Sequence, residues 1–391
     1  MKLKQFALIF VGLTLFCSCS VIQAPVTAQP SAMPLATPAP TPTSDPVSTV
    51  RFSATGDDLI HGQLYLQAQQ RTADGSYDFL PLYEHVAPFY SEQDLNFINQ
   101  ETNVNDEIPP SSYPLFSSPA AVGKTIYDMG FRLIGMSNNH SYDLGASGIA
   151  ATKRFWAAMP SDVLTFGLVE NGKEDEIPVY DKNGLRFACL AYTQYTNGLP
   201  TPQDAIAHVI YTSDTETIER QIKQARAVAD VVLVSVHWGN EDSHTTTDGQ
   251  RALAQQMADW GADLIIGTHP HVLQGAEWLQ REGRSPALVA YSLGNFVSAQ
   301  SRPDEMIGAV LSCTFTKQGA QNIEIENVQF HPTVTHYGYN YSNVTVYFLK
   351  DYTAELARQH GVCTDYPYFN YDYVEDVVKE NIPAEFLQSP S

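Results

Sequence analysis

The stretch Ala262–Val272, ADLIIGTHPHV, decides the fold. Its apolar run Leu264–Ile266 is short, rich in isoleucine and followed by a glycine, which is typical of a buried strand. His269 and His271 come directly after this strand, with Pro270 between them. Residues two apart in an extended segment project to the same side, and proline restricts itself and the preceding residue to extended geometry. We therefore expect both imidazoles to face one point at the strand end, where two histidines suit a metal ion.

Strand-like and helix-like segments alternate on both sides of this stretch. The predicted strands are 50–54, 95–98, 131–136, 185–192, 231–236 and 287–291, and the predicted helices are 118–129, 148–158, 218–225 and 248–260. The helix near 218 is expected to begin with a capping box formed by Ser213 and Glu216. Strands that alternate with helices indicate parallel sheets built from βαβ units.

Length, charge and cysteine content exclude several classes of protein. The 391 residues suffice for one large domain or two ordinary ones, and the formal charge of −21 disfavours nucleic acid and anionic surfaces as partners. Five cysteines without a CxxC pair indicate neither a disulfide scaffold nor a zinc knuckle. Cys189 lies in an apolar run and is predicted to be a small core residue.

The N-terminal segment has the form of a secretory leader. Residues 1–20 carry two lysines, then an apolar run too short to span a membrane, then the ending FCSCS, which resembles a bacterial lipoprotein box with Cys19 as the lipidated residue. An ordinary cleaved leader is the alternative. Residues 21–47 hold seven of the 24 prolines and are predicted to form an extended tether. We therefore expect an extracytoplasmic protein, lipid-anchored to the bacterial cell membrane.

The folded part is predicted to comprise a main domain, 48–332, and a C-terminal extension, 333–391. The extension is rich in tyrosine and contains two helix candidates, 351–360 and 373–381. We expect it to pack on the main domain as a cap.

Candidate metal ligands follow five of the predicted strands. In open α/β sheets, ligands bind at the carboxyl ends of the strands, where side chains far apart in sequence converge. Carboxylate, amide and imidazole groups without a thiolate favour Mn, Fe or Zn, and their number suits two ions about 3.5–4 Å apart. The candidates at these strand ends are Asp57, then Asn99 and Glu101, then Asn139 and His140, then His237, and finally His269 and His271.

Each of these residues, taken alone, also fits an ordinary structural role. Asp57 after a glycine suits a turn, Asn138 and Asn139 suit a loop with positive φ, and His237 beside a tryptophan suits a hydrogen-bonded core position. The histidine pair alone fits a polar loop equally well. The metal hypothesis depends on all of them standing at strand ends together.

A set of motifs in a fixed order resembles the CapA family of bacterial capsule-synthesis (poly-γ-glutamate) proteins, relatives of the calcineurin-like metallophosphoesterases. The resemblance covers about residues 48–332 and implies a four-layer α/β/β/α sandwich with a dinuclear metal site. The motifs that carry it are GDDLIH at 56–61, NQET at 99–102, NNHSYDLG at 138–145, HWGNE at 237–241, GTHPHVLQG at 267–275 and YSLGNFV at 291–297.

The resemblance also implies roles for single residues. Asp57 would bridge two ions, one held with Asn139, His237 and His269 and the other with Glu101 and His271. His140 would be the general acid or stabilise the transition state. Asn138, Asn295 and Glu241 are assigned to substrate binding.

One motif departs from the superfamily pattern. The first strand usually carries an Asp-x-His pair, and here only Thr55-Gly56-Asp57 is present. His61, four residues beyond Asp57, is the candidate substitute ligand or second catalytic histidine.

Three functions remain open from the sequence. The first is a metal-dependent phosphoesterase-type hydrolase that acts on a phosphorylated small molecule. The second is a non-catalytic envelope protein that binds or anchors an acidic capsule polymer. The third is a metal-dependent hydrolase of γ-glutamyl amide bonds.

Overall fold

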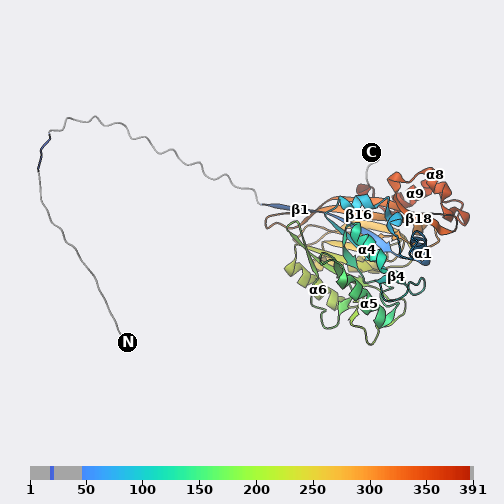
Figure 1. Cartoon of the computed structure of the whole chain (residues 1–391). Coiled ribbons are helices and arrows are strands. Elements are labelled where there is room, and N and C mark those ends of the chain that lie inside the picture. Colours follow the sequence, from blue (N-terminus) through green and yellow to red (C-terminus); the bar gives the residue numbers. More distant parts are fainter. Residues whose placement is uncertain (1–17, 22–45, 388–391) are drawn as a thin grey trace, which may run out of the picture. The chain divides into compact units, whose positions relative to one another are not determined.

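The computed structural model describes residues 18–21 and 46–387 of the chain (Figure 1). The predicted leader and tether fall mainly on residues 1–17 and 22–45, which lie outside the described residues. Cys19 is described, and its thiol is exposed and free. In the described parts, no helix has both the length and the apolar composition needed to cross a bilayer.

The first of two large sheets, in residues 46–387, has eight strands. Their order is β18–β17–β16–β1–β2–β5–β6, with β15 beside the end of β1. Strands β1, β2, β5, β6 and β15 run parallel, and β16, β17 and β18 run antiparallel to their neighbours. The bounds are Val47–Asp58 (β1), Leu95–Gln100 (β2), Phe131–Gly135 (β5), Leu164–Phe166 (β6), Asn295–Val297 (β15), Ile307–Gln318 (β16), Glu324–Gly338 (β17) and Ser342–Phe348 (β18).

The second large sheet has six strands in the order β13–β14–β12–β11–β9–β8. Its four central strands are parallel, and the two edge strands are antiparallel to them. The bounds are Val179–Lys182 (β8), Leu185–Thr193 (β9), Val231–His237 (β11), Leu264–Thr268 (β12), Leu273–Leu279 (β13) and Ala287–Leu293 (β14).

The apolar side chains of β11 show how this sheet is buried on both faces. Val231 and Leu233 pack in the core between the sheets, whereas Val232, Val234 and Val236 pack under the helices on the other face. This alternation follows from the two-residue period of a strand, and a strand covered on both sides reads as a continuous apolar run. Aromatic rings fill the space between the sheets, where Phe315 contacts Phe52 and Phe187 at centroid distances of 5.6 and 5.4 Å.

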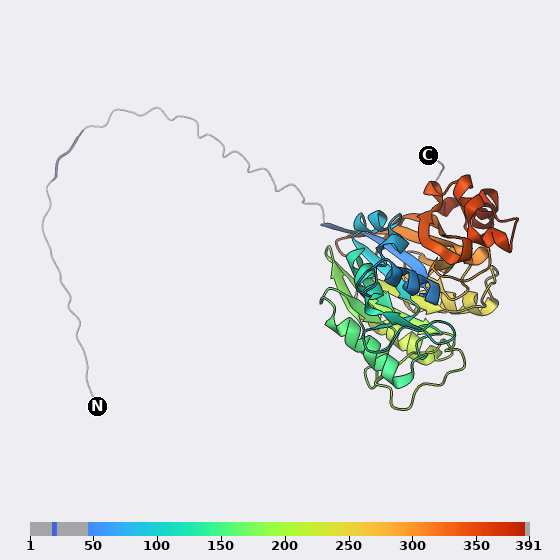
Figure 2. The same cartoon turned by 45° about the vertical axis from the view of Figure 1, so that its right-hand side comes forward.

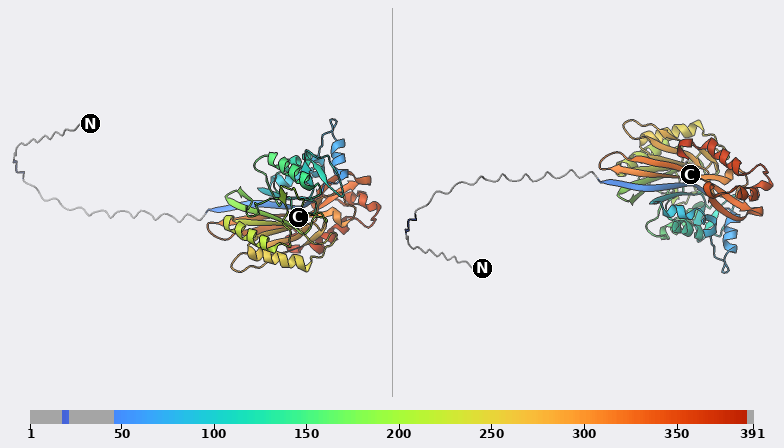
Figure 3. Two further views of the ribbon diagram at one scale, coloured as in Figure 1. Left: turned by 90° about the horizontal axis from the view of Figure 1, so that it is seen from below. Right: turned by 90° about the horizontal axis from the view of Figure 1, so that it is seen from above.

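Helices cover the outer face of each sheet, which completes the predicted four-layer α/β/β/α sandwich (Figure 3). Helices α4 (Ala120–Asp128) and α5 (Gly145–Ala158) lie on the first sheet, and α6 (Thr215–Val228) and α7 (Asp248–Trp260) lie on the second. Shorter elements fill the connections: α1 (Gly62–Gln70), α2 (Leu80–Tyr83), α3 (Ala87–Ser91), β3 (Asn103–Asn105), β4 (Ser117–Pro119), β7 (Val169–Glu170) and β10 (Ala207–His208).

Capping residues account for the helix boundaries. Helix α7 has the predicted bounds because Thr247 and Gln250 form a capping box at its start and Gly261, with φ of 130°, ends it. The predicted capping box at Ser213 and Glu216 is wrong. Asp214 is the N-cap of α6, and its side chain accepts a hydrogen bond from the Thr217 amide instead.

The C-terminal region continues the first sheet. The boundary expected between residues 332 and 333 falls inside β17, and β18 pairs with β17 in turn. Beyond β18, helices α8 (Ala354–Gln359) and α9 (Tyr371–Asn381) pack on β17, β13 and β16 (Figure 2). Residues 333–387 therefore share the core of the sandwich.

Candidate metal centre

The predicted ligands meet because the parallel strands of both sheets end on the same side of the molecule. In the first sheet, Asp57 pairs in register with Asn99 and with Asn295. In the second sheet, His237 pairs with Thr268, the last residue of β12. The carboxyl ends of five parallel strands thus surround one buried group of polar side chains, as the strand-end rule predicts.

Two glycines allow the strands to approach each other closely at this point. A Cβ on Gly56 would lie 1.8 Å from the carbonyl oxygen of Gly294, and a Cβ on Gly267 would lie 1.9 Å from that of Tyr291. Only glycine fits both positions without moving the backbone. These close approaches bring Asp57 and His269 to the centre of the group.

The extended geometry predicted for the histidine pair is wrong. His269 has φ of +98° and His271 has φ of +60°, so both lie in the left-handed region on either side of Pro270. The two imidazoles still face one site, with ring centroids 5.9 Å apart. Positive φ is unfavourable for a non-glycine residue and concentrates at functional sites. The surrounding contacts hold this strained turn, and strand alternation plays no part.

Four donor atoms converge around the side chain of His237. Its Nε2 lies 3.0 Å from Asn139 Oδ1, 3.1 Å from His269 Nδ1 and 3.6 Å from Glu101 Oε1. Ligand atoms bound to one divalent ion at about 2.0–2.2 Å lie roughly 3.0–3.5 Å from one another. The distances from His237 Nε2 to Asn139 Oδ1 and His269 Nδ1 therefore suit a shared cation, whereas Glu101 Oε1 lies slightly farther away and forms a close group with Asp57 and His271.

Asp57 lies beside this group and contacts a second set of donors. Its Oδ1 accepts a hydrogen bond from Asn99 Nδ2 at 2.7 Å, and its Oδ2 accepts one from the His269 amide at 3.1 Å. His271 Nδ1 lies 3.3 Å from the same Oδ2, and His271 Nε2 lies 3.8 Å from Glu101 Oε1. Asp57, Glu101 and His271 each offer one ligand atom, all within 4.8 Å of one another.

Glu101 gives the clearest sign that a cation belongs here. Its side chain is fully buried, and neither carboxylate oxygen has a hydrogen-bond partner among the described residues. Burial and the nearby carboxylate of Asp57 raise the pKa of Glu101 well above its ordinary value. A buried carboxylate that accepts no hydrogen bond is unfavourable unless a cation lies beside it. The donor set and this orphaned carboxylate together fit a divalent metal.

Burial and neighbouring charges also shift the pKa values of the histidines in this centre. Burial lowers the pKa of His269 to about 3, and the neighbouring His271 adds to that effect. For His271, the carboxylates of Glu101 and Asp57 outweigh burial and raise the pKa to about 10. The centre therefore favours a proton on His271 between two carboxylates, which is a position that a metal cation would suit.

Two residues fix the orientation of the ligating histidines. Thr268 Oγ1 lies 2.9 Å from His237 Nδ1, which leaves Nε2 facing the centre. The hydroxyl of Tyr195 donates to the Gly239 carbonyl and lies 2.7 Å from His269 Nε2, which leaves Nδ1 facing the centre. Partners of this kind select the tautomer and the ring orientation of a metal-binding histidine.

His140 lies at the edge of the centre in a pair with a carboxylate. Its Nδ1 lies 2.8 Å from Asp143 Oδ2, which also accepts a hydrogen bond from the Phe116 amide. Because a carboxylate only accepts, the pair places a proton on Nδ1 and leaves Nε2 to exchange protons. Burial lowers the pKa of His237 well below its ordinary value, and His269, His271 and His140 add to that effect, so His140 lies within electrostatic reach of the donors.

His61 is near the centre but outside the donor groups. The ring of Phe116 separates it from His140, with centroid distances of 5.2 Å to His61 and 4.7 Å to His140. His61 Nδ1 contacts the Leu59 carbonyl and the Ala299 amide. Within residues 46–387, two groups of three His, Cys, Asp or Glu residues lie close enough to hold a metal ion, and His61 belongs to neither.

The three predicted substrate-binding residues differ in their surroundings. Glu241 is exposed and forms a second group of close donors with His269 and His271. Asn295 contacts His271 Nδ1 through Oδ1 at 3.0 Å. Asn138 donates to the Gln100 carbonyl and accepts from the His140 amide, so its side chain holds the loop together.

Sequence reasoning missed Tyr195 and Asp143. Tyr195 lies just after β9, a sixth strand whose carboxyl end carries no histidine or carboxylate. The sequence pattern therefore predicts no metal-site residue there. Asp143 lies three residues after His140, a spacing that signals a histidine–carboxylate pair.

The fold and the centre together define an α/β/β/α sandwich protein with a candidate metal centre at the carboxyl ends of its parallel strands. Residues 51–300 match the family described as bacterial capsule synthesis protein PGA_cap, and the chain belongs to this family.

Named relatives agree with this assignment and confirm the resemblance to CapA. The chain is 28% identical over 284 residues to the PGA biosynthesis protein CapA of Bacillus subtilis, covering 71% of each protein. It is 32% identical over 231 residues to the capsule biosynthesis protein CapA of Bacillus anthracis, covering 56% of this chain and 54% of that protein. Among solved structures, the NAD nucleotidase of Haemophilus influenzae is similar with a TM-score of 0.42 at 11% identity, over 88% of this chain and 65% of that one.

Proposed function

We propose that this chain is a metal-dependent hydrolase of the phosphoesterase type that acts in capsule biosynthesis. The observation that carries the proposal is Glu101, a buried carboxylate that lies beside His237 and His271 and accepts no hydrogen bond from the part of the chain that the structure describes. When bound, divalent ions would supply Lewis-acid activation of water and of the phosphoryl oxygens. Asn139, His237 and His269 would hold one ion, and Glu101 and His271 the other, with Asp57 between them.

The protein side chains supply orientation and proton transfer. His140 donates its Nδ1 proton to Asp143, so a proton for the leaving-group oxygen would come from Nε2 of the doubly protonated imidazolium. Asn197 lies beside this histidine, and its Oδ1 accepts a hydrogen bond from Asn139 Nδ2 at 3.3 Å. Asn197 and Glu241 are exposed above the buried donors, so a substrate would meet them first.

The test measures metal content and turnover on the full chain. We expect the purified protein to bind Mn²⁺ or Zn²⁺ and to hydrolyse an aryl phosphate, and we expect His269→Ala to abolish both properties. The same preparations are assayed on a γ-glutamyl amide and on poly-γ-glutamate. Amide cleavage alone would replace the phosphoesterase proposal with an amidase. Saturable polymer binding without turnover would replace it with a binding protein. Metal-free protein whose activity survives His269→Ala would overturn the metal proposal.

We also propose that the protein is anchored outside the cell membrane by a lipid on Cys19. The apolar run before this residue and the FCSCS sequence support the proposal. The test compares membrane fractions of cells that express the wild type or Cys19→Ala. We expect the wild type to partition into detergent and the variant to be released. Equal partitioning of the two proteins would contradict lipidation at Cys19.

A further inference from the structure

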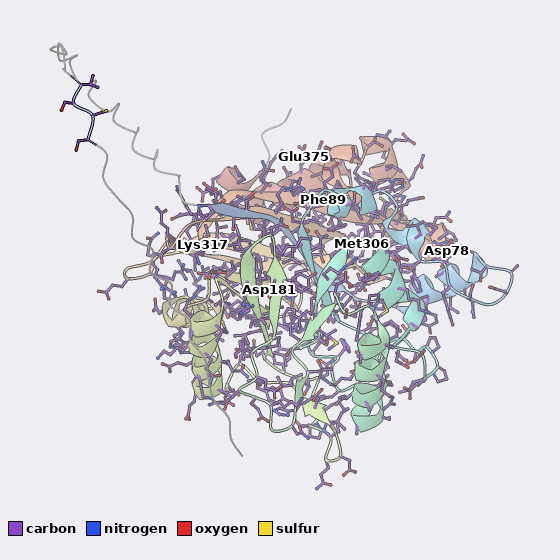
Figure 4. The ribbon with its side chains drawn as sticks, turned by 60° about the vertical axis from the view of Figure 1, so that its left-hand side comes forward. Asp78, Phe89, Asp181, Met306, Lys317 and Glu375 are labelled. Atoms are coloured by element: carbon purple, nitrogen blue, oxygen red, sulfur yellow. The ribbon has the colours of Figure 1, made fainter. Side chains whose placement is uncertain are left out.

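A cavity of about 190 Å³ lies at the end of the sheets opposite to the candidate metal centre. It is formed where β11, β12 and β14 begin and where β16 ends. Figure 4 labels Met306, just before β16, and Lys317, near its end, at opposite ends of that strand. The charged residues that line the cavity are Arg226, Asp230, Asp263, Arg281, Arg284 and Lys317.

The cavity is cationic in a strongly anionic protein. Four basic side chains line it against two carboxylates, whereas the whole chain has a formal charge of −21. A cavity lined mainly by basic side chains concentrates anions locally, because the electrostatic field at a concave site depends on the charges that line it.

Both carboxylates are already engaged by the protein. Asp263 accepts hydrogen bonds from Arg226 at 2.6 Å and from Arg281 at 3.0 Å. It also accepts one from the amide of Val232 at 2.8 Å. Asp230 forms an ion pair with Lys317 and accepts a hydrogen bond from the backbone amide of Arg186. Each carboxylate thus already forms an ion pair with a basic side chain, and the cavity holds one further cation.

Arg284 is that further cation. It is half-buried and makes no hydrogen bond or ion pair within residues 46–387, although a guanidinium carries five N–H donors. It shares the space beside Gly261 with Arg226, since a Cβ on Gly261 would lie 3.2 Å from Arg284 Nη1 and 3.2 Å from Arg226 Cβ. Burial and the adjacent charge of Arg226 lower the pKa of Arg284. Two arginines thus share the carboxylate of Asp263, and a third, Arg284, lines the open cavity without an ion pair among the described residues.

We propose that this cavity is an anion site that binds the oxygens of a carboxylate or phosphate group through Arg284. A planar guanidinium suits two-point contact with such oxygens, and charge-assisted hydrogen bonds of this kind are strong. The site would hold an acidic chain or a phosphorylated molecule away from the candidate metal centre. The proposal does not depend on hydrolysis at that centre.

The experiment titrates the full chain with two probes, inorganic phosphate and tri-γ-glutamate, by calorimetry at low salt. Arg284→Gln removes the unpaired guanidinium. Arg154→Gln is the matched control, because Arg154, on α5, carries the same charge and forms an exposed ion pair with Glu107. We expect Arg284→Gln to weaken binding of at least one probe about 10- to 100-fold and Arg154→Gln to leave it unchanged.

The two probes distinguish the sources of the anion. Arg284-dependent binding of tri-γ-glutamate would identify a polycarboxylate ligand, and binding of phosphate alone would identify a phosphorylated one. Either result supports the site. No binding of either probe, or an equal loss in both variants, would overturn it. Thermal unfolding of Arg284→Gln provides the folding control, and a stabilised or unchanged melting temperature is expected because the variant relieves repulsion among three arginines.

Discussion

Without metal, we expect the Glu101→Gln variant to be more stable than the wild type. With metal, we expect the wild type to be the more stable of the two. In metal-free protein, the carboxylate of Glu101 is buried and accepts no hydrogen bond from the described residues. A neutral amide avoids the cost of burying a charge at this position, and an unsatisfied buried group costs about 1–3 kcal/mol, more when it is charged. We therefore expect Glu101→Gln to be about 2 kcal/mol more stable than the wild type without metal. With metal present, the wild type gains binding energy that the variant lacks.

The corresponding temperature shifts are small but measurable. Roughly 340 described residues at about 2.1 cal/mol/K each give an unfolding entropy near 0.7 kcal/mol/K. A 2 kcal/mol gain then raises the melting temperature by about 3 °C. Metal at about 100 times its Kd adds about 2.7 kcal/mol to the wild type, or about 4 °C.

The assay is thermal unfolding of chelator-treated protein with and without Mn²⁺. Glu219→Gln, on the exposed surface of α6, is the matched control and should change stability by less than about 0.5 kcal/mol in both conditions. A metal-free Glu101→Gln protein that is less stable than the wild type, together with an undiminished metal shift, would falsify the assignment of Glu101 as a ligand.

Three further variants test separate parts of the structure. His140→Asn should lower kcat on an aryl phosphate about 10²- to 10⁴-fold while metal content stays constant, and full activity would exclude His140 as the proton donor. Tyr195→Phe removes the hydroxyl beside His269 Nε2 and should weaken metal affinity about 10- to 100-fold in a metal titration, whereas unchanged affinity would show that Tyr195 does not orient the ligand. Burial lowers the pKa of His360 to about 3. Below the ordinary value of 6.5 the unfolded chain takes up a proton that the folded protein does not, so the free energy of unfolding falls by about 1.4 kcal/mol per pH unit as the pH drops toward 3. Urea unfolding at pH 7 and pH 5 should therefore show a smaller loss in His360→Gln than in the wild type, by about 2 kcal/mol, and equal losses would refute this account.

The α/β/β/α sandwich and the set of residues in the candidate metal centre could be predicted because both depend on short local sequence patterns. Short apolar runs such as Val231–Val236 became strands, and the residues just beyond them met because parallel strands end on one side. The bounds of α7 were predictable because Thr247 and Gly261 specify where a helix starts and stops.

The antiparallel half of the first sheet was not predictable in this way. The first half of β17 is largely exposed and mixes charged with apolar residues. Its sequence therefore shows neither the two-residue period of a strand nor the 3.6-residue period of a helix. The turn at His269 and His271 was mispredicted because its positive φ values depend on contacts with Asp57, which is more than 200 residues away in sequence. Such long-range contacts leave no local signal.

The direction of β1 separates the point where the chain enters the sandwich from the candidate metal centre. The strand begins at Val47 and ends beside Asp57, so its 12 residues span about 36–40 Å from the point of entry to the candidate ligands. A bead or sensor chip coupled directly at Val47 would therefore attach at the far end of the strand. Attachment at that point should leave Glu241 and Asn197 open to polymers or small esters in solution.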